Sequence, residues 1–166
     1  MFLAERGVTL SAIQAGILVR EIKAHETDVV RKLVGIEKQA FGNGGLHNEW
    51  LFLPVLRYGK VLAAETGGEF IGSAQFIRTW TGDGTAYFYG ISLLPEYRGR
   101  GLGTEFLERS FSILKDEGII RLILSVSPDN RGAVYLYREK LGFWEKEYVK
   151  DEYGPGEDRL IMEREL

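Results

Sequence analysis

The sequence predicts an α+β fold, with one mixed sheet and helices on both of its faces. The first observation is periodicity: seven segments have the pattern of strands, and four have the 3.6-residue period of amphipathic helices. The second is their order, β-α-α-β-β-β-α-β-α-β-β, which indicates a mixed sheet. The third is uniformity: the 166 residues are 45% hydrophobic and contain no repeat, low-complexity tract or linker. We therefore expect residues 1–166 to form a single domain.

The strands are expected at residues 17–23, 61–66, 69–80, 87–94, 119–126, 143–150 and 160–165. Gly67-Gly68 predicts a two-residue hairpin between the second and third of them. The fifth is so rich in Ile and Leu that it predicts a central strand buried on both faces. The last alternates apolar and charged residues, which is typical of a half-exposed strand.

The helices are expected at residues 28–41, 48–57, 102–117 and 129–141. Thr27 is the predicted cap of the first helix, and Gly42 is its predicted end. Pro54 lies inside the second helix, so that helix should be short or kinked. Residues 43–45 are expected to form a loop, and residues 1–16 an N-terminal extension or a short extra helix.

The composition excludes several classes of function. A net charge of −3 and a pI of about 5.5 argue against a nucleic-acid binder. The lack of cysteine excludes disulfides and thiolate nucleophiles, and two histidines offer little to a metal site. No window has the ~18 apolar residues of a membrane span, and residues 1–16 make a poor secretory signal. We expect a cytoplasmic protein without metal, nucleic-acid or membrane partners. A homodimer remains open.

The most informative stretch is the turn between the fourth strand and the third helix. Its residues are Arg98, Gly99, Arg100, Gly101, Leu102, Gly103 and Thr104. Free N–H groups at a helix start, glycines that let a ligand touch the backbone, and two arginines favour a phosphate or pyrophosphate site. The dinucleotide fingerprint and the P-loop both fail on spacing. A plain glycine-rich turn is the alternative interpretation.

Two segments resemble a known family. Arg98-x-x-Gly101-x-Gly103 resembles the acetyl-CoA pyrophosphate loop of the GNAT N-acetyltransferases. Asn130-x-x-Ala133-x-x-Leu136-Tyr137-x-x-x-x-Gly142-Phe143 looks like the family's other hallmark segment. This resemblance covers residues 17–166 and implies a single-domain GNAT-like fold with a mixed, mostly antiparallel sheet of about seven strands. A weaker likeness, Gly-Glu-Asp at residues 156–158, is similar to protein N-terminal (Nα) acetyltransferases.

The resemblance implies an acetyl-CoA-dependent N-acetyltransferase, in which a primary amine attacks the acetyl carbonyl of the co-substrate directly. The implied contacts to acetyl-CoA are Leu93, Leu94, Arg98, Gly99, Arg100, Gly101, Leu102, Gly103, Thr104 and Asn130. A backbone N–H near Leu93 would face the thioester, and Leu93-Leu94 would pair with the pantetheine arm like an added strand. Asn130 fits a helix cap equally well.

Tyr137 is the implied general acid for the departing thiolate. A tyrosine pKa of about 10 against a thiol pKa of about 8.5 makes that transfer uphill by about 2 kcal/mol. Packing is the alternative role, because Ala133, Tyr137 and Leu141 form one helix stripe.

No general base stands out. Several family members have a glutamate at positions that match Tyr87 and Ser125 here. A water chain through Tyr87, Tyr89 and Ser125 is one route for the amine proton. The carboxylates Glu49, Asp83 and Asp129 are weaker candidates.

The acceptor amine would lie among aromatic side chains, for which the candidates are Phe41, Trp50, Trp80, Tyr148 and Tyr153. It is either a protein N-terminus or a small-molecule amine. Two competing functions stay open: an acyl-CoA sensor without turnover, and a nucleotide-binding regulatory domain.

Overall fold

The computed structural model describes residues 16–42 and 46–166; the expected N-terminal extension at 1–15 and the loop at 43–45 lie outside these residues. The strands are β1 (Leu18–Glu21), β2 (Lys60–Thr66), β3 (Glu69–Arg78), β4 (Thr85–Leu93), β5 (Arg121–Val126), β6 (Trp144–Val149) and β7 (Arg159–Glu165). The helices are α2 (Thr27–Phe41), α3 (Glu49–Tyr58), α4 (Leu102–Asp116) and α5 (Arg131–Tyr135), with a 3₁₀ turn η1 (Pro95–Tyr97) and a π-helical turn η2 (Leu136–Lys140). No helix in the described part of the chain combines the length and apolar character that a membrane crossing needs.

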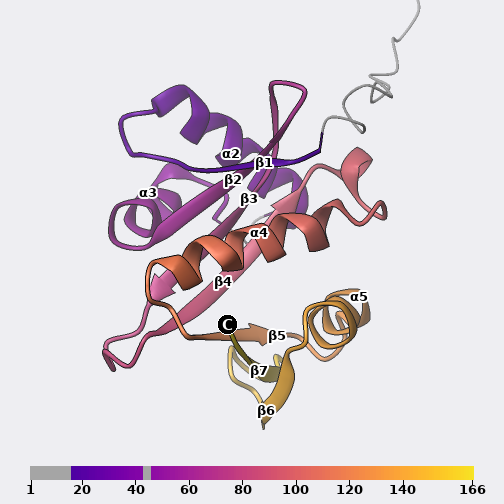
Figure 1. Ribbon diagram of the computed structural model, residues 1–166. Helices are drawn as coiled ribbons and strands as arrows, with labels where there is room; N and C mark the ends of the chain where they lie inside the picture. The colour runs from indigo at the N-terminus through magenta and orange to yellow at the C-terminus, as the bar shows by residue number, and fades with distance from the viewer. Residues whose placement is uncertain (1–15, 43–45) are drawn as a thin grey trace, which may run out of the picture.

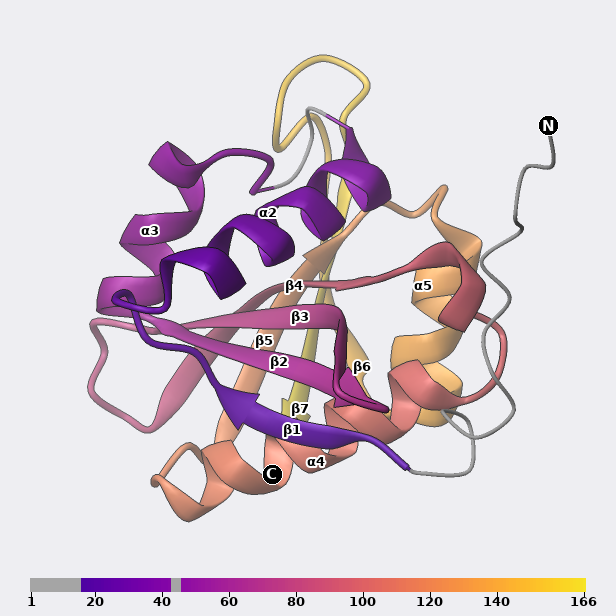
Figure 2. The ribbon, with the colours of Figure 1, turned by 90° about the horizontal axis from the view of Figure 1, so that it is seen from above.

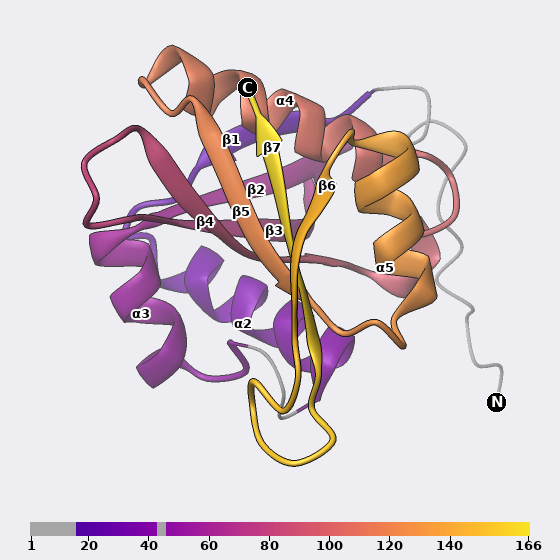
Figure 3. The same cartoon turned by 90° about the horizontal axis from the view of Figure 1, so that it is seen from below.

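The strands form one sheet in the order β1-β2-β3-β4-β5-β7-β6 (Figure 1). Every neighbouring pair is antiparallel except β4 and β5, which run parallel. Helices α2 and α3 cover one face of this sheet, and α4 and α5 cover the other (Figures 2 and 3). The predicted mixed sheet with helices on both faces is therefore confirmed.

Two apolar cores fill the space between the layers. One core lies under α4 and includes Phe88 and Phe106; the other lies under α2 and α3 and includes Leu33 and Phe52. Strand β2 contributes to both cores, because its residues 61–64 are all fully buried. The expectation that β5 is buried on both faces is wrong: only Leu122, Leu124 and Val126 are buried. The alternate residues are half-buried, and among them Ser125 lines a cleft.

The helix ends agree with the predicted ones to within two residues, and two of these ends have an unexpected structure. Glu26, rather than Thr27, is the N-cap residue of α2, and its carboxylate accepts a hydrogen bond from the Lys23 N–H instead of capping the helix. The helix predicted at 129–141 is α-helical only as far as Tyr135. Beyond it the Leu141 N–H bonds the Leu136 carbonyl five residues back, which makes η2 a π turn. Such wider turns occur often at functional sites.

The course of β4 positions the site. The register between β3 and β4 shifts between Gln75 and Phe76, so that Gly90 and Phe88 have partners and Tyr89 is the extra residue of a bulge. On its other side β4 pairs with β5 only from Thr85 to Tyr87. The bulged strand bends at this point, and beyond it the two parallel strands separate.

Candidate active site

A cleft of about 480 Å³ opens where β4 and β5 separate. Its lining residues are Phe41, Tyr87, Tyr89, Gly90, Ile91, Ser125, Val126, Ser127, Asn130, Ala133, Leu136, Tyr137, Tyr153 and Arg159. They come from α2, the two separated strands, the α5–η2 segment and the region around the start of β7. The cleft therefore unites segments from both halves of the chain.

The edge of β4 offers unpaired backbone groups to this cleft. The Leu94 N–H donates to the Ile71 carbonyl (2.8 Å), so this N–H group points toward β3. Antiparallel pairing alternates direction along a strand, and the N–H groups of Ile91 and Leu93 therefore face away from β3, toward the edge that β5 has left. Ile91 lines the cleft itself.

The glycine-rich turn connects β4 to the start of α4. Gly99 and Gly101 have φ angles of 71° and 79°, which side chains adopt with strain, and Gly101 is the N-cap residue of α4. At Gly103 the reason for glycine is packing as well as ligand access, because a Cβ there would lie 3.2 Å from the Leu93 side chain. The turn presents the first N–H groups of α4 without a capping side chain.

The two arginines of the turn have different surroundings. The Arg98 Nε donates to the Leu93 carbonyl (2.9 Å), which fastens the turn to the end of β4. Arg100 is exposed. Arg98 therefore holds the shape of the turn, and Arg100 contributes positive charge near it.

Tyr137 packs against the core and also lines the cleft. Its ring is packed edge-to-face against Phe88 and Phe143, with ring centroids 5.9 and 5.8 Å apart, so the packing role is confirmed. The residue is 8% exposed and lines the cleft. Burial raises the pKa of the Tyr137 hydroxyl to about 12. The hydroxyl stays protonated at neutral pH and can donate a hydrogen bond into the cleft.

A cluster of tyrosines occupies another part of the cleft. The rings of Tyr87 and Tyr89 are 6.3 Å apart. Burial is the main reason why the pKa of Tyr87 lies well above its ordinary value, and the neighbouring Tyr153 is the second reason. Burial raises the pKa of Tyr89 as well. The Ser125 Oγ is buried, with no hydrogen-bond partner of good geometry among the described residues. These hydroxyls are neutral groups that can hold water molecules in the cleft.

Asn130 caps α5: its Oδ1 accepts a hydrogen bond from the Ala133 N–H (3.2 Å). The expected cap is thus confirmed, and the same side chain lines the cleft. Leu93 is the last residue of β4, and Leu94 is the N-cap residue of the turn η1 that leads to the glycine turn.

Three of the aromatic candidates for the acceptor site lie elsewhere. Trp50 is on the outer side of α3, Trp80 is fully exposed after β3, and the Tyr148 hydroxyl donates to the Asp158 carboxylate. Phe41 and Tyr153 do line the cleft. The aromatic pattern alone does not reveal which ring faces a cleft, because that depends on how distant elements pack.

The carboxylates considered as general bases also lie outside the cleft. Asp83 accepts hydrogen bonds from the Thr81 hydroxyl and the Thr85 N–H, which stabilise its turn, and Glu49 lies on α3. Asp129 is exposed. Among the described residues that line the cleft there is no Asp, Glu or His.

Two features of the cleft were not predicted from the sequence. One is the backbone of Ile91 at the bulged edge of β4. The other is Arg159, whose guanidinium lies 4.4 Å from the centre of the Tyr153 ring and donates to the Asp158 carbonyl. The pairing of Val126 with Leu160 carries Arg159 to the cleft end of β5. An antiparallel alignment of the last strand on β5 could have signalled this residue.

A model of the acetyltransferase (GNAT) family matches residues 35–143, a range that includes the glycine turn, Asn130 and Tyr137. The chain belongs to the GNAT acetyltransferase family. One relative of this GNAT protein is an N-alpha-acetyltransferase of Saccharolobus solfataricus, 39% identical over 77 residues, which are 46% of each chain. The chain spans about half or less of the first curated relatives that it matches.

Solved structures of the family share the fold. The ribosomal-protein-S18-alanine N-acetyltransferase of Escherichia coli superimposes with a TM-score of 0.76 at 22% identity, over 90% of this chain and 94% of that one. A GNAT acetyltransferase of Elizabethkingia anophelis with acetyl-CoA bound has a TM-score of 0.71 at 17% identity, over 91% and 99% of the two chains. The expected GNAT-like fold is confirmed.

Proposed function

We propose that this GNAT protein transfers an acetyl group from acetyl-CoA to the α-amine of a peptide or protein N-terminus. The single observation that carries the proposal is the cleft between β4 and β5, which has free backbone N–H groups at one edge and the Tyr137 side chain in its lining. The family and its acetyl-CoA-bound member support acetyl-CoA as the donor.

Acetyl-CoA would lie along the open edge of β4. Its pyrophosphate would meet the first N–H groups of α4 at residues 101–104, with Arg98 and Arg100 beside them. Its pantetheine arm would pair with the backbone of Leu93 and Leu94, and Asn130 would approach it from the other wall. The thioester would then reach the cleft lined by Ile91 and Tyr137.

The reaction would form a C–N bond and break the C–S bond. The neutral amine attacks the acetyl carbonyl, and the N–H groups of Ile91 and Leu93 stabilise the resulting oxyanion. The amine proton leaves through water held by Tyr87, Tyr89 and Ser125. As the C–S bond breaks, the Tyr137 hydroxyl hydrogen-bonds the thiolate and supplies its proton, which Tyr137 regains from solvent.

The pKa of Tyr137 limits how this acid works. Transfer from a group of pKa about 12 to a free thiolate of pKa about 8.5 is uphill by about 5 kcal/mol. Burial raises the pKa of a thiol for the same physical reason, so the difference narrows inside the cleft. Tyr137 is therefore a hydrogen-bond donor through most of the step and completes the transfer late.

The described residues that line the cleft include no carboxylate, and this favours an α-amine over a lysine side chain. Without a strong base the acceptor must arrive largely neutral. An α-amine has a pKa near 8, so about a tenth or more of it is neutral at pH 7, against well under 1% of a lysine amine of pKa about 10.4. The Arg159 guanidinium in the lining further disfavours a bound ammonium. Two named relatives that acetylate protein alanine or α-amines support the same choice.

The test uses one peptide with a free N-terminus and an internal lysine, and a matched peptide whose N-terminus is blocked. We expect acetylation at the α-amine only, located by fragment mass spectrometry, and no product from the blocked peptide. The rate should rise with pH, because protonation removes the attacking lone pair, and level off near the α-amine pKa of about 8. Modification of the lysine would contradict the acceptor class. Binding of acetyl-CoA without CoA release on any amine would identify a sensor instead.

A further inference from the structure

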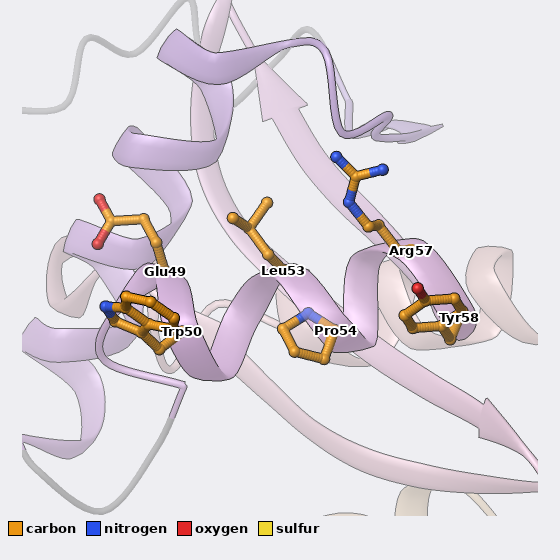
Figure 4. A pocket seen from close by; sticks show the side chains of 6 residues that line it. All are labelled: Glu49, Trp50, Leu53, Pro54, Arg57 and Tyr58. Carbon is orange, nitrogen blue, oxygen red and sulfur yellow. The ribbon is translucent and has the colours of Figure 1, made fainter.

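A second hollow lies outside the cleft, on the outer side of α3, where it has a volume of about 420 Å³ (Figure 4). Its lining is Glu49, Trp50, Leu53, Pro54, Arg57 and Tyr58. Trp50 is 89% exposed and Tyr58 is 85% exposed, which is unusual for two large rings on one short helix. None of these residues belongs to the proposed catalytic machinery, so the exposed rings need a separate explanation.

The six side chains form two rows along the helix, which Figure 4 shows from close by. Residues four apart in a helix lie in one ridge. The first row is Glu49, Leu53 and Arg57, which reads acid, apolar, base. The second row is Trp50, Pro54 and Tyr58, which reads aromatic, apolar, aromatic. Reversing the direction of the helix exchanges Glu49 with Arg57 and leaves the second row aromatic at both ends.

We propose that this face of α3 binds the same face of a second copy of the chain, with the two helices antiparallel about a two-fold axis. A two-fold interface must be complementary to itself, because the same patch meets its own copy. Antiparallel ridges place Glu49 against Arg57 of the other copy at both ends, and Trp50 against Tyr58 in the neighbouring row. Leu53 and Pro54 lie in the middle of the face. A parallel arrangement would instead oppose like charges.

The size of the face sets the strength of the dimer. The helix has ten residues and is therefore about 15 Å long. Two large rings from each copy would bury roughly 700 Å² in all. That area is below the roughly 1,200 Å² of stable interfaces, so the dimer is weak and depends on concentration. A weak contact of this kind is sensitive to single charges at its ends.

The test uses analytical ultracentrifugation of the full chain over a roughly hundredfold range of concentration. The wild type should show a reversible monomer–dimer equilibrium. Glu49→Arg and Arg57→Glu should each weaken it by about tenfold or more, because each variant alone opposes like charges at both ends. A mixture of the two variants should dimerise as well as the wild type, since every end then has opposite charges.

Matched controls keep the result interpretable. Asp116→Arg makes an equal change of charge on α4, on the other face of the sheet, and should leave the monomer–dimer equilibrium unchanged. Circular dichroism of each variant establishes that it is folded, which we expect because Glu49 and Arg57 are exposed. A wild type that stays monomeric at every concentration, or a mixture that dimerises no better than either variant alone, would overturn the proposal. A partner of another kind on this face would give the first of these results.

Discussion

At the scale of single residues, Tyr137 separates packing from chemistry. Tyr137→Phe keeps the ring that contacts Phe88 and Phe143 and removes only the hydroxyl. We expect the free energy of unfolding to change by about 1 kcal/mol or less. Turnover should fall by about 10²–10⁴-fold if the hydroxyl serves the leaving thiolate. Steady-state release of CoA, together with urea unfolding, measures both quantities.

A tyrosine two residues earlier provides the control. Tyr135 is 57% exposed on the same helical segment and is not among the residues that line the cleft. Tyr135→Phe should keep normal turnover. Affinity for CoA should stay within a few-fold in both variants, because the proposed phosphate site is at the start of α4. Near-normal turnover in Tyr137→Phe would show that water, rather than tyrosine, protonates the thiolate.

At the scale of elements, the glycine turn between β4 and α4 contains two arginines with separate tasks. Arg100→Ala removes an exposed charge, so CoA affinity should fall about two- to fivefold at low salt, and this loss should largely vanish at high salt. Arg98→Ala also releases the Leu93 carbonyl, so its loss should persist at high salt. Calorimetry of CoA binding at about 0.05 M and about 0.5 M salt distinguishes the two.

Arg109→Ala is the matched control, because Arg109 pairs with Glu105 further along the same helix. It should leave CoA affinity unchanged. If Arg100→Ala has full affinity at low salt, Arg100 does not contact the phosphates. If the losses of Arg98→Ala and Arg100→Ala fade equally with salt, the bond from Arg98 to the backbone has no role in shaping the site.

At the scale of the whole molecule, a buried polar network ties helix α2 to the sheet. Glu37 is 2% exposed, and its carboxylate accepts hydrogen bonds from Gln75 Nε2 (2.9 Å) and Ser73 Oγ (3.4 Å). Ser73 in turn contacts Ser92 of β4 across the strands (3.3 Å). Burial and then Tyr153 raise the pKa of Tyr89, and the Glu37 carboxylate adds a smaller increase. The network therefore connects α2, which contributes Phe41 to the cleft, with β4, whose edge forms one side of the cleft.

Removal of the Glu37 carboxylate should therefore destabilise the fold. Glu37→Ala removes the buried acceptor that Gln75 Nε2 and Ser73 Oγ share and opens a cavity, so we expect a loss of about 3 kcal/mol in urea unfolding. Glu37→Gln keeps an acceptor for Gln75 and removes a buried charge, so its loss should be below about 1 kcal/mol. Equal stability of the two variants would show that the network does not hold α2.

Much of the fold was predictable because its signals are local. The periodicity of a strand or a helix is visible within a few residues of sequence. The glycines at 67–68 and 99–103 likewise indicate turns, whatever the rest of the chain does. Helix ends were less predictable: the cap of α2 and the π turn η2 depend on hydrogen bonds that several residues could make. Asn130 and Tyr137 could be selected from the sequence as well, because the family motif that contains them is a short run of neighbouring residues.

The sequence by itself therefore determined the order of the elements, the glycine turn at the start of α4, and the segment that carries Tyr137. Only the tertiary structure decided which side chains meet in the cleft. Phe41, Tyr153 and Arg159 line it while Trp50 and Tyr148 do not, and no described carboxylate enters it. The physical reason is that the cleft arises from the bulge at Tyr89 and the separation of β4 from β5. Both depend on pairing between strands far apart in the chain, which no local pattern records.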